Sequence, residues 1–504
     1  MAGGVKDFIP LFYTPALRLP NRTRCPYSVK KIMEQIDYQG LKVLVMGLGL
    51  HGGGTASARF LAERGAEITC TDLRGEAELE PSLKELGDLD IQYVLGTHRE
   101  KDFETADMIV KNPAVPVNSP WIAGRKNIET DISLFLKSSS APLLALTGSK
   151  GKSTAVSALY HILKTQYPGT KLGGNITVSP LSFVHDLKPD SPVILELSSW
   201  QLADLRGRGI LHPRICGITN LMHDHQNRYE SFKDYEADKT VILENLSSDD
   251  YSVFPDDSYG KRWAGISGGN SLFVKKGVPE NKNFQGAYLD DTGRGWFSSP
   301  NNMEKEQLLP EKLLVPGEPF RINSLFASLM ARLWGCNSET ILSSISNYSG
   351  VPYRMEMFLE SGGIRYYDDT TATIPDACTA AVKAMDRPVI LIAGGTDKEL
   401  DFAPFDEAAA IPKRIIMLKG SATETWIPRL RSASVVIEGP YESMDAAVIA
   451  AQNYAVPGDA ILLSPGATSF GMFQHEFKRG DAFKSSCRKI TESLKKLELI
   501  NKPL

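Results

Sequence analysis

Residues 147–154 read Thr-Gly-Ser-Lys-Gly-Lys-Ser-Thr, and this stretch decides the fold expected for the chain. The apolar run 142–146 before it predicts a short buried strand, and the apolar spacing of 155–163 after it predicts a helix. A strand that feeds a glycine-rich turn into a helix points several backbone N–H groups at one place, where the helix dipole favours an anion. The sequence therefore predicts a site for the phosphates of a nucleoside triphosphate.

Two side chains of this turn carry chemistry. Lys152 adds a positive charge for the outer phosphates, and the Ser153 hydroxyl can ligate Mg²⁺. Only two residues separate Gly148 from Gly151, so the turn is shorter than the common Gly-x-x-x-x-Gly-Lys-Ser. A chance Gly-Lys-Ser on a surface turn is the alternative interpretation.

Length and composition set the class of protein. A chain of 504 residues should form about three domains. The hydrophobic content of 42%, the charged content of 23% and the net charge of -4 are typical of a soluble globular protein without a nucleic-acid surface. The six cysteines are scattered, no apolar run is long enough to span a bilayer, and the N-terminus lacks the apolar core of a signal peptide. We therefore expect a cytoplasmic protein.

A second glycine turn precedes the first one. The strand expected over 41–46 runs into residues 47–52, which read Gly-Leu-Gly-Leu-His-Gly and match Gly-x-Gly-x-x-Gly. A helix pattern through 56–64 and a strand over 66–71 follow, and that strand ends at Asp72. This order resembles a dinucleotide fingerprint, with Asp72 on a ribose hydroxyl. The pattern alone does not separate NAD from another nucleotide, and a tight turn that binds nothing is the alternative.

Polar side chains follow later strands of the second unit. The strand expected over 192–195 ends at Glu196, and the strand over 214–218 ends at Thr219 and Asn220. Ligands of open α/β sheets bind beyond the carboxyl ends of the strands. Glu196 is therefore placed as a metal ligand or a water-positioning carboxylate, with an ordinary strand-end charge as the alternative.

The next segments are less informative by themselves. His225 lies in a polar loop, His-Asp-His-Gln-Asn, and Lys239 lies near Tyr235 at the start of an expected helix. Taken alone, the histidine resembles a solvated loop residue and the lysine a surface residue. Residues 251–301 predict short strands and loops without chemistry.

Strands and helices alternate again from about residue 351. A helix is expected over 376–385, between strands over 364–367 and 388–393, and a later strand is expected over 460–463. Polar clusters follow these three strands, at 368–369, 394–398 and 464–469. The alternation predicts a third parallel sheet whose binding edge lies at the strand carboxyl ends.

In this order the pieces resemble the Mur ligases, ATP-dependent enzymes that add amino acids to the peptidoglycan precursor. The resemblance covers nearly the whole chain from about Leu41. It rests on residues 147–154, Gly174-Asn175-Ile176, 195–202 (Leu-Glu-Leu-Ser-Ser-Trp-Gln-Leu), Asp224-His225, Tyr235 with Lys239, and 352–356 (Pro-Tyr-Arg-Met-Glu). Within the family, the pattern is most similar to the enzymes that add D-glutamate to UDP-N-acetylmuramoyl-L-alanine.

The resemblance implies an α/β fold of three domains after an N-terminal extension, residues 1–40. Residues 41–140 would form a Rossmann-like domain that binds the UDP substrate. Residues 141–349 would form a P-loop ATPase-like domain with a mostly parallel sheet. Residues 350–504 would form a Rossmann-like domain for the acceptor amino acid. A monomer is favoured.

The resemblance also implies the reaction. ATP would phosphorylate the terminal carboxylate of UDP-N-acetylmuramoyl-L-alanine, and the amine of D-glutamate would attack the acyl phosphate. Charge neutralisation and in-line positioning dominate such transfers. Two Mg²⁺ ions are implied, one near Ser153 and Glu196 and one held by His225 and a carbamylated Lys239.

The roles that the resemblance assigns fall into five groups. The catalytic residues are Lys152, Glu196, His225 and Lys239. The ATP-binding residues are Gly148, Ser149, Lys150, Gly151, Lys152, Ser153, Thr154, Asn323, Arg354 and Asp369. The UDP-substrate residues are Leu50, His51, Asp72, Arg74 and Asn175. The acceptor residues are Thr373, Lys398 and Ser469, and Lys398 could pair with a carboxylate of glutamate. The metal ligands are Ser153, Glu196, His225 and Lys239.

Departures from the family pattern concentrate in the last domain. A substrate-facing lysine is replaced by Thr371, and a phenylalanine aligns with Glu476, next to Phe477. The central Gly-x-His-Asn reads Gly-Glu-Pro-Phe at 317–320, and His51 replaces a commoner threonine. The acceptor amino acid is therefore less well determined than the ligase chemistry.

Three alternatives stay open on sequence. A sister ligase would use another acceptor such as L-glutamate, or resemble folylpolyglutamate synthase. A nicotinamide-dependent oxidoreductase would explain 47–72 but not the phosphate loop. A non-catalytic nucleotide-binding relative would have no reason to keep Lys152, Glu196, His225 and Lys239.

Overall fold

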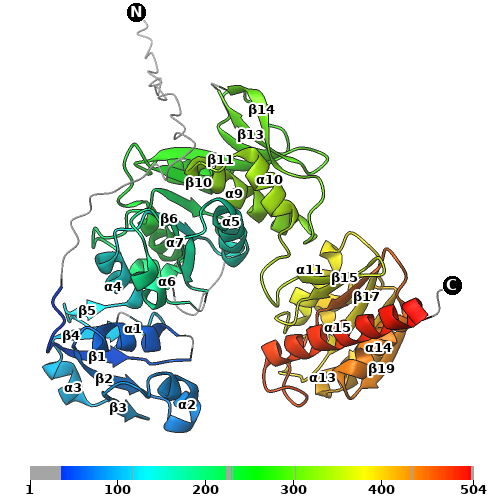
Figure 1. Cartoon of the computed structure of the whole chain (residues 1–504), viewed down its shortest axis with the longest axis horizontal. Helices are drawn as coiled ribbons and strands as arrows, with labels where there is room; N and C mark the ends of the chain where they lie inside the picture. The colour runs from blue at the N-terminus through cyan, green and yellow to red at the C-terminus, as the bar shows by residue number, and fades with distance from the viewer. Residues whose placement is uncertain are drawn as a thin grey trace, which may run out of the picture.

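Three sheets follow one another along the chain and form the cores of three lobes (Figure 1). The structure is a computed structural model, and it describes residues 36–50, 52–116, 118–176, 178–222, 229, 231–300, 302–432 and 435–500. The sheets confirm the expected α/β class with three largely parallel sheets. Most of the expected N-terminal extension lies outside the described residues. The boundaries expected near residues 140 and 349 fall between sheets and stay predictions.

The first sheet has the order β3-β2-β1-β4-β5, and its strands are all parallel. Its strands are β1 (Lys42–Met46), β2 (Glu67–Asp72), β3 (Ile91–Leu95), β4 (Met108–Lys111) and β5 (Ile128–Glu129). The helices around it are α1 (Gly53–Ala62), α2 (Glu76–Glu85), α3 (Glu100–Thr105) and α4 (Asp131–Ser138). The apolar strand β1 lies in the middle, and the strand order reverses between β1 and β4. Ligands of such sheets bind at this reversal.

The second sheet has nine strands in the order β14-β13-β12-β11-β10-β9-β6-β8-β7. The strands are β6 (Leu143–Thr147), β7 (Lys171–Gly174), β8 (Val193–Glu196), β9 (Ile215–Ile218), β10 (Tyr251–Pro255), β11 (Asn270–Lys276), β12 (Gly286–Leu289), β13 (Gly295–Ser299) and β14 (Asn302–Leu309). Its α-helices are α5 (Lys152–Gln166), α6 (Ser199–Ala203), α7 (Phe232–Thr240), α8 (Ser258–Ala264), α9 (Glu318–Trp334) and α10 (Ser338–Ser346), with 3₁₀ helices at Pro180–Asp186 and Val241–Leu243. The β12–β13 and β13–β14 pairings are antiparallel, and the strands β10 to β13 agree with the short strands expected over 251–301.

Helix α7 corrects one expectation. The sequence predicts that Tyr235 and Lys239 start a helix, but α7 begins at Phe232 and Lys239 lies in its last turn. The physical reason is the cap: Ser231 Oγ accepts a hydrogen bond from the backbone N–H of Asp234 at 3.2 Å.

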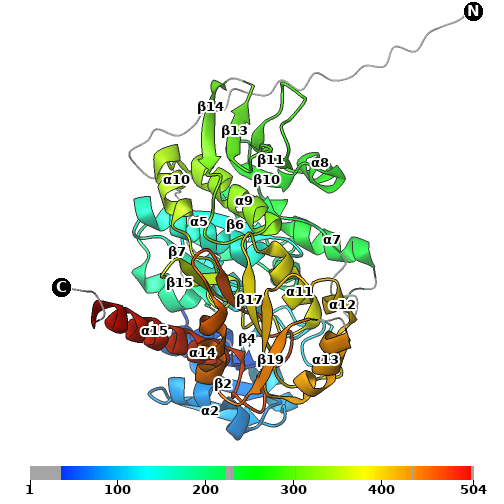
Figure 2. The ribbon, with the colours of Figure 1, turned by 90° about the vertical axis from the view of Figure 1, so that its right-hand side faces the viewer.

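The third sheet has the order β15-β16-β20-β17-β18-β19, with only β15 antiparallel to its neighbour. Its strands are β15 (Glu356–Ser361), β16 (Ile364–Asp368), β17 (Val389–Gly394), β18 (Arg414–Leu418), β19 (Ile437–Tyr441) and β20 (Ala460–Leu463). Its helices are α11 (Pro375–Ala384), α12 (Ala403–Asp406), α13 (Ser421–Ser432), α14 (Met444–Tyr454) and α15 (Glu476–Ile500). Helices α14 and α15 lie side by side over one face (Figures 1 and 2).

The buried apolar side chains connect the first two lobes but not the third. One continuous cluster of buried side chains includes Val45 of β1, Phe135 of α4 and Leu195 of β8, so it runs through the first and second lobes. The third sheet has separate clusters on its two faces, around Trp426 and around Phe483. The first two lobes therefore share a core, and the third has its own. In the part of the chain that the structure describes, no helix is long and apolar enough to cross a membrane.

Candidate active site

The phosphate loop joins β6 to α5 with two glycines in left-handed conformations. Gly148 has φ 147° and Gly151 has φ 82°, which other residues rarely adopt. A Cβ on Gly148 would lie 2.0 Å from Thr219 Oγ1, and one on Gly151 would lie 2.4 Å from Asn323 Oδ1. The left-handed backbone and the close approach of these two side chains favour glycine at both positions, and Asn323 of α9 lies against the loop.

Thr219 and Asn220, which follow β9, form hydrogen bonds with the phosphate loop. Ser149 N donates to Asn220 O at 3.1 Å, and Lys150 N donates to Asn220 Oδ1 at 2.9 Å. Thr219 Oγ1 donates to Lys150 O at 2.7 Å. The polar residues expected at the end of this strand therefore shape the loop itself.

Two lysines converge on one carbonyl of the loop. Lys152 Nζ donates to Gly148 O at 2.9 Å, and Lys239 Nζ donates to the same oxygen at 2.9 Å. Lys239 is only 1% exposed and lies over the Tyr235 ring, 4.4 Å from its centroid. The lysine that resembles a surface residue by itself is thus buried next to the phosphate loop.

Glu196 lies at the carboxyl end of β8, beside the loop, and is 1% exposed. Asn175 Nδ2 donates to Glu196 Oε1 at 2.9 Å, whereas Oε2 is buried without a hydrogen-bond partner in the described structure. Burial raises the pKa of Glu196, and Asn175, Ser153, Lys152 and Arg354 oppose that increase. An orphaned carboxylate oxygen next to a serine hydroxyl fits a hard divalent cation.

The described side chains do not form a metal site alone. Among them, no three His, Cys, Asp or Glu residues come together closely enough to hold a metal ion. His225 and His51 lie outside the described residues. A cation at Glu196 would therefore need oxygens from Ser153, a modified lysine or the substrate phosphates as well.

A cavity of about 350 Å³ opens between the first and second lobes. Its lining includes Gly53 after the first glycine turn, Asn112 after β4, and Lys152, Asn175 and Lys239 of the second lobe. Lys152 and Lys239, two of the predicted catalytic residues, thus share one cavity with Asn175, which was expected to contact the UDP substrate.

A second cavity of about 530 Å³ lies between the second and third lobes. The predicted ATP residues in its lining are Gly151, Thr154, Asn323, Arg354 and Asp369. Thr373 and Thr371 line it too, so Thr373 lies with the nucleotide residues rather than with Lys398 and Ser469.

Asp369 lines the second cavity, and both of its carboxylate oxygens accept hydrogen bonds. Its Oδ1 accepts from Met355 N at 3.1 Å, and its Oδ2 accepts from Ser464 Oγ at 2.8 Å. Burial raises the pKa of Asp369 to about 7. The carboxyl group therefore links the connection between the lobes to the loop that follows β20.

The predicted acceptor residues Lys398 and Ser469 follow neighbouring strands of the third sheet. Lys398 Nζ lies 4.8 Å from the centroid of the Phe470 ring. Ser469 Oγ is buried and has no hydrogen-bond partner among the described residues. Thr396 and Thr468 bridge the two loops, with Thr468 Oγ1 donating to Thr396 O at 2.9 Å.

In the first lobe, the first glycine turn (residues 47–52) is hydrogen-bonded to Asp72 at the end of β2. Asp72 Oδ2 accepts from Gly49 N at 3.1 Å, and Asp72 Oδ1 accepts from Arg74 N at 3.0 Å. Leu50 and the Arg74 side chain are both 49% exposed beside this turn, and Arg74 lies 3.7 Å from Asp72 Oδ2. The predicted UDP residues that the structure describes here are therefore adjacent.

Comparison with known proteins decides the family. The N-terminal domain model of MurD-like Mur ligases matches residues 41–133, and the Mur ligase middle domain model matches 146–331. A UDP-N-acetylmuramoylalanine–D-glutamate ligase of Treponema pallidum (strain Nichols) is 37% identical over 90% of this chain and 98% of its own length. One of Borreliella afzelii (strain PKo) is 40% identical over 89% and 98%. The chain belongs to the Mur ligase family.

Solved structures agree with the fold. UDP-N-acetylmuramate–alanine ligase MurC from Thermotoga maritima superposes with a TM-score of 0.55 at 17% identity, covering 89% of this chain and 99% of that one. MurF from Acinetobacter baumannii gives 0.53 at 14% identity, covering 91% and 95%. This Mur ligase is therefore an ATP-dependent enzyme that forms a C–N bond.

Two buried charged residues could not be recognised from the sequence pattern. Asp131 lines the first cavity, and its pKa is raised to about 6 by burial, yet it reads as an ordinary helix start after Thr130. Arg479 is 1% exposed and donates to Thr370 O and Ala467 O, yet it reads as a surface residue of α15. Only contacts between distant segments identify them.

Proposed function

We propose that this Mur ligase joins D-glutamate to UDP-N-acetylmuramoyl-L-alanine, forming ADP and phosphate from ATP. The convergence of Lys152, Glu196 and Lys239 around the phosphate loop carries the proposal. The relatives at 37–40% identity, named as ligases for this pair of substrates, support the choice of substrates.

The chemistry starts from a poor acyl donor. A carboxylate oxygen becomes a leaving group when the γ-phosphoryl group of ATP is transferred to it. The amine of D-glutamate then attacks the carbonyl carbon, the C–O bond to phosphate breaks, and the amine loses a proton. Each step gathers anions, so Lys152 and the loop N–H groups act by neutralising and aligning them.

Glu196, Ser153, Lys239 and His225 are the residues that would hold Mg²⁺. The buried, unpartnered Glu196 Oε2 supports this assignment. When bound, the ions would neutralise charge on the phosphates. In its ammonium form, Lys239 would repel a cation.

Carbamylation of Lys239 would remove that conflict. The ammonium group of Lys239 is buried and shares Gly148 O with the ammonium group of Lys152. Conversion to a carbamate would replace a buried positive charge with a carboxylate beside Lys152 and would supply metal-binding oxygens. Both changes lower the free-energy cost of burying the Lys152 ammonium group and a metal ion at this site.

The remaining predicted binding residues lie in the first and third lobes, except for Asn175 of the second. Leu50, His51, Asp72, Arg74 and Asn175 would bind the UDP substrate, and Thr373, Lys398 and Ser469 the acceptor. We infer that the enzyme works as a monomer in the cytoplasm, where the five described cysteines, all free and buried, would stay reduced.

Isotope transfer tests the acyl phosphate. The substrate is labelled with ¹⁸O in the alanine carboxylate and incubated with ATP and D-glutamate. The proposal predicts one labelled oxygen in each phosphate released, because the carboxylate oxygen leaves with the phosphoryl group. Product formation with unlabelled phosphate would refute the acyl-phosphate route.

A further inference from the structure

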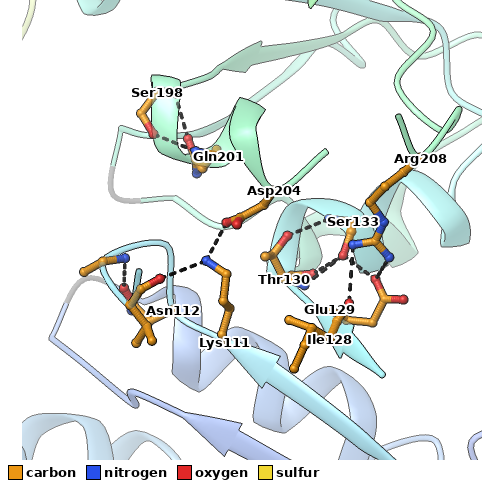
Figure 3. A network of polar contacts seen from close by, with 12 residues as sticks. Lys111, Asn112, Ile128, Glu129, Thr130, Ser133, Ser198, Gln201, Asp204 and Arg208 are labelled. Atoms are coloured by element: carbon orange, nitrogen blue, oxygen red, sulfur yellow. Dashed lines mark hydrogen bonds and ion pairs between the residues drawn. The ribbon is translucent and has the colours of Figure 1, made fainter. Parts of the chain in front are cut away.

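A buried ion pair connects the first two lobes beside the first cavity. Lys111 Nζ lies 2.6 Å from Asp204 Oδ2, and the two side chains are 2% and 4% exposed (Figure 3). Lys111 Nζ also donates to Val115 O at 3.1 Å. Lys111 therefore interacts both with the loop that follows β4 and with the second lobe.

The two partners line a cavity of about 210 Å³ between the first two lobes, and each is close in sequence to residues that line the 350 Å³ cavity. Lys111 ends β4 of the first lobe, and the next three residues, 112–114, line the cavity. Asp204 follows α6 of the second lobe, and residues 198–201 at the start of α6 line the cavity as well. The ion pair thus sets the position of one wall relative to the other.

Short-range contacts make each wall stiff. In the first lobe, Asn112 N donates to Met46 O at 2.9 Å, and Asn112 Oδ1 accepts from Ala114 N at 3.0 Å. In the second, Ser198 and Gln201 form a reciprocal cap, with Gln201 N donating to Ser198 Oγ at 3.2 Å. A shift at the ion pair is therefore passed on to the cavity rather than absorbed.

The pair differs from the neighbouring polar contact between the lobes. Arg208 of the second lobe lies 2.6 Å from Glu129 of the first, but these side chains are 25% and 10% exposed, against 2% and 4% for Lys111 and Asp204. Water can replace a partly exposed pair. A fully buried pair requires its partners in one geometry, which makes it suited to fixing register rather than to adding stability.

We propose that Lys111 and Asp204 are a positioning pair for the UDP substrate. The inference rests on the proposed function, in which the nucleotide end of the substrate lies at the first glycine turn and its carboxylate lies at the phosphate loop. One molecule then spans both lobes, and their register decides whether the carboxylate reaches the γ-phosphate. Displacements near 1 Å at such a centre reduce rates by roughly 100-fold.

Paired substitutions test the proposal. Lys111→Met leaves a buried unpaired carboxylate, so the main variant is the double Lys111→Met/Asp204→Leu, which removes both charges and keeps the interface apolar. We expect kcat/KM for UDP-N-acetylmuramoyl-L-alanine to fall by about tenfold or more. We expect KM for ATP and D-glutamate to stay within about twofold, because their contacts lie elsewhere.

Two further variants serve as controls. Lys413→Met removes a lysine that lies 2.6 Å from a buried aspartate, Asp459, before the amino end of β18. Neither residue lines the first or the second cavity, so this variant should leave kcat/KM unchanged. Lys111→Arg keeps the charge and should recover most of the activity. Wild-type kinetics in the double variant would overturn the proposal. A loss of activity that is fully accounted for by a fall in the melting temperature would also overturn it, since it would indicate a purely structural role. Absence of turnover in the wild type would refute the proposed function and this inference with it.

Discussion

At the scale of single residues, the site depends on groups whose burial the sequence does not display. Lys152 is predictable because its turn has a recognisable spacing. Lys239 is not, since it lies 87 positions further along and reaches Gly148 O only through the packing of α7 against the loop. The family resemblance predicted a role for it, and its burial beside the phosphate loop supports that proposal.

Removal of the Lys152 charge should nearly abolish turnover. Lys152→Ala is expected to lower kcat by about 100-fold to 1,000-fold, because a preorganised positive charge is lost where phosphate charge develops. Steady-state phosphate release measures it. Lys164→Ala, on the same helix but away from the loop, is the control. Near-normal turnover in Lys152→Ala with an unchanged melting temperature would show that the phosphates bind elsewhere.

Because of Asp369, the free energy of unfolding should decrease as the pH rises. Its pKa is raised by burial from 3.8 to about 7, so the folded state holds the proton more tightly than the unfolded state. The protonated carboxyl thus stabilises the fold below pH 4, and this contribution is lost between pH 4 and about 7. Asp369→Asn should therefore gain about 3 kcal/mol in free energy of unfolding relative to wild type between pH 5 and pH 8, because the folded carboxyl loses its proton over about two pH units of that window.

Urea unfolding of both proteins at these two pH values measures the difference. The variant should also lose ATP turnover, because Asp369 is assigned to the nucleotide. A stability difference that is equal at both pH values would contradict the raised pKa.

At the scale of elements, strand–turn–helix units are the most predictable feature. The apolar runs before residues 47 and 148 become β1 and β6, and the helices after them follow as expected. Two details were not predictable from local pattern. Helix α7 starts earlier than expected because Ser231 caps it, and β5 has only two residues and pairs with β4 through tertiary packing.

The phosphate turn should tolerate no side chain at Gly151. In Gly151→Ala the alanine would have to adopt a left-handed φ of 82°, and its Cβ would lie 2.4 Å from Asn323 Oδ1. Gly207→Ala meets a left-handed φ of 67° in open space, so it isolates the backbone cost of about 1–2 kcal/mol. We expect Gly151→Ala to be the less stable variant and to raise KM for ATP by about tenfold, which is about 1.4 kcal/mol of lost binding. Equal effects of the two substitutions on stability and KM would contradict the described turn.

At the scale of the whole molecule, the first two lobes share an apolar core and the third does not. The connection to the third lobe contains two non-glycine residues with positive φ, Tyr353 at 64° and Met355 at 47°. Such strain concentrates in switch and hinge regions. The sequence predicted three sheets from alternating patterns, but contacts between lobes, such as Lys111 with Asp204, involve residues 93 positions apart and leave no local signal.

Ligands should bring the third lobe closer to the others. The cavity between the second and third lobes includes Asn323 on one side and Asp369 on the other, so a nucleotide that contacts both favours closure. Small-angle X-ray scattering should give a smaller radius of gyration with a non-hydrolysable ATP analogue and UDP-N-acetylmuramoyl-L-alanine than without them. An identical scattering profile in both states would contradict this movement.

Acceptor selection is the most direct test of the proposed function. Phosphate release from ATP is measured with UDP-N-acetylmuramoyl-L-alanine and, in turn, D-glutamate, L-glutamate and D-aspartate. We predict release with D-glutamate alone, which would mean that Thr371 and Glu476 are tolerated replacements in the third lobe. Release only with another amino acid would contradict the proposed acceptor and make those two residues candidates for its selection.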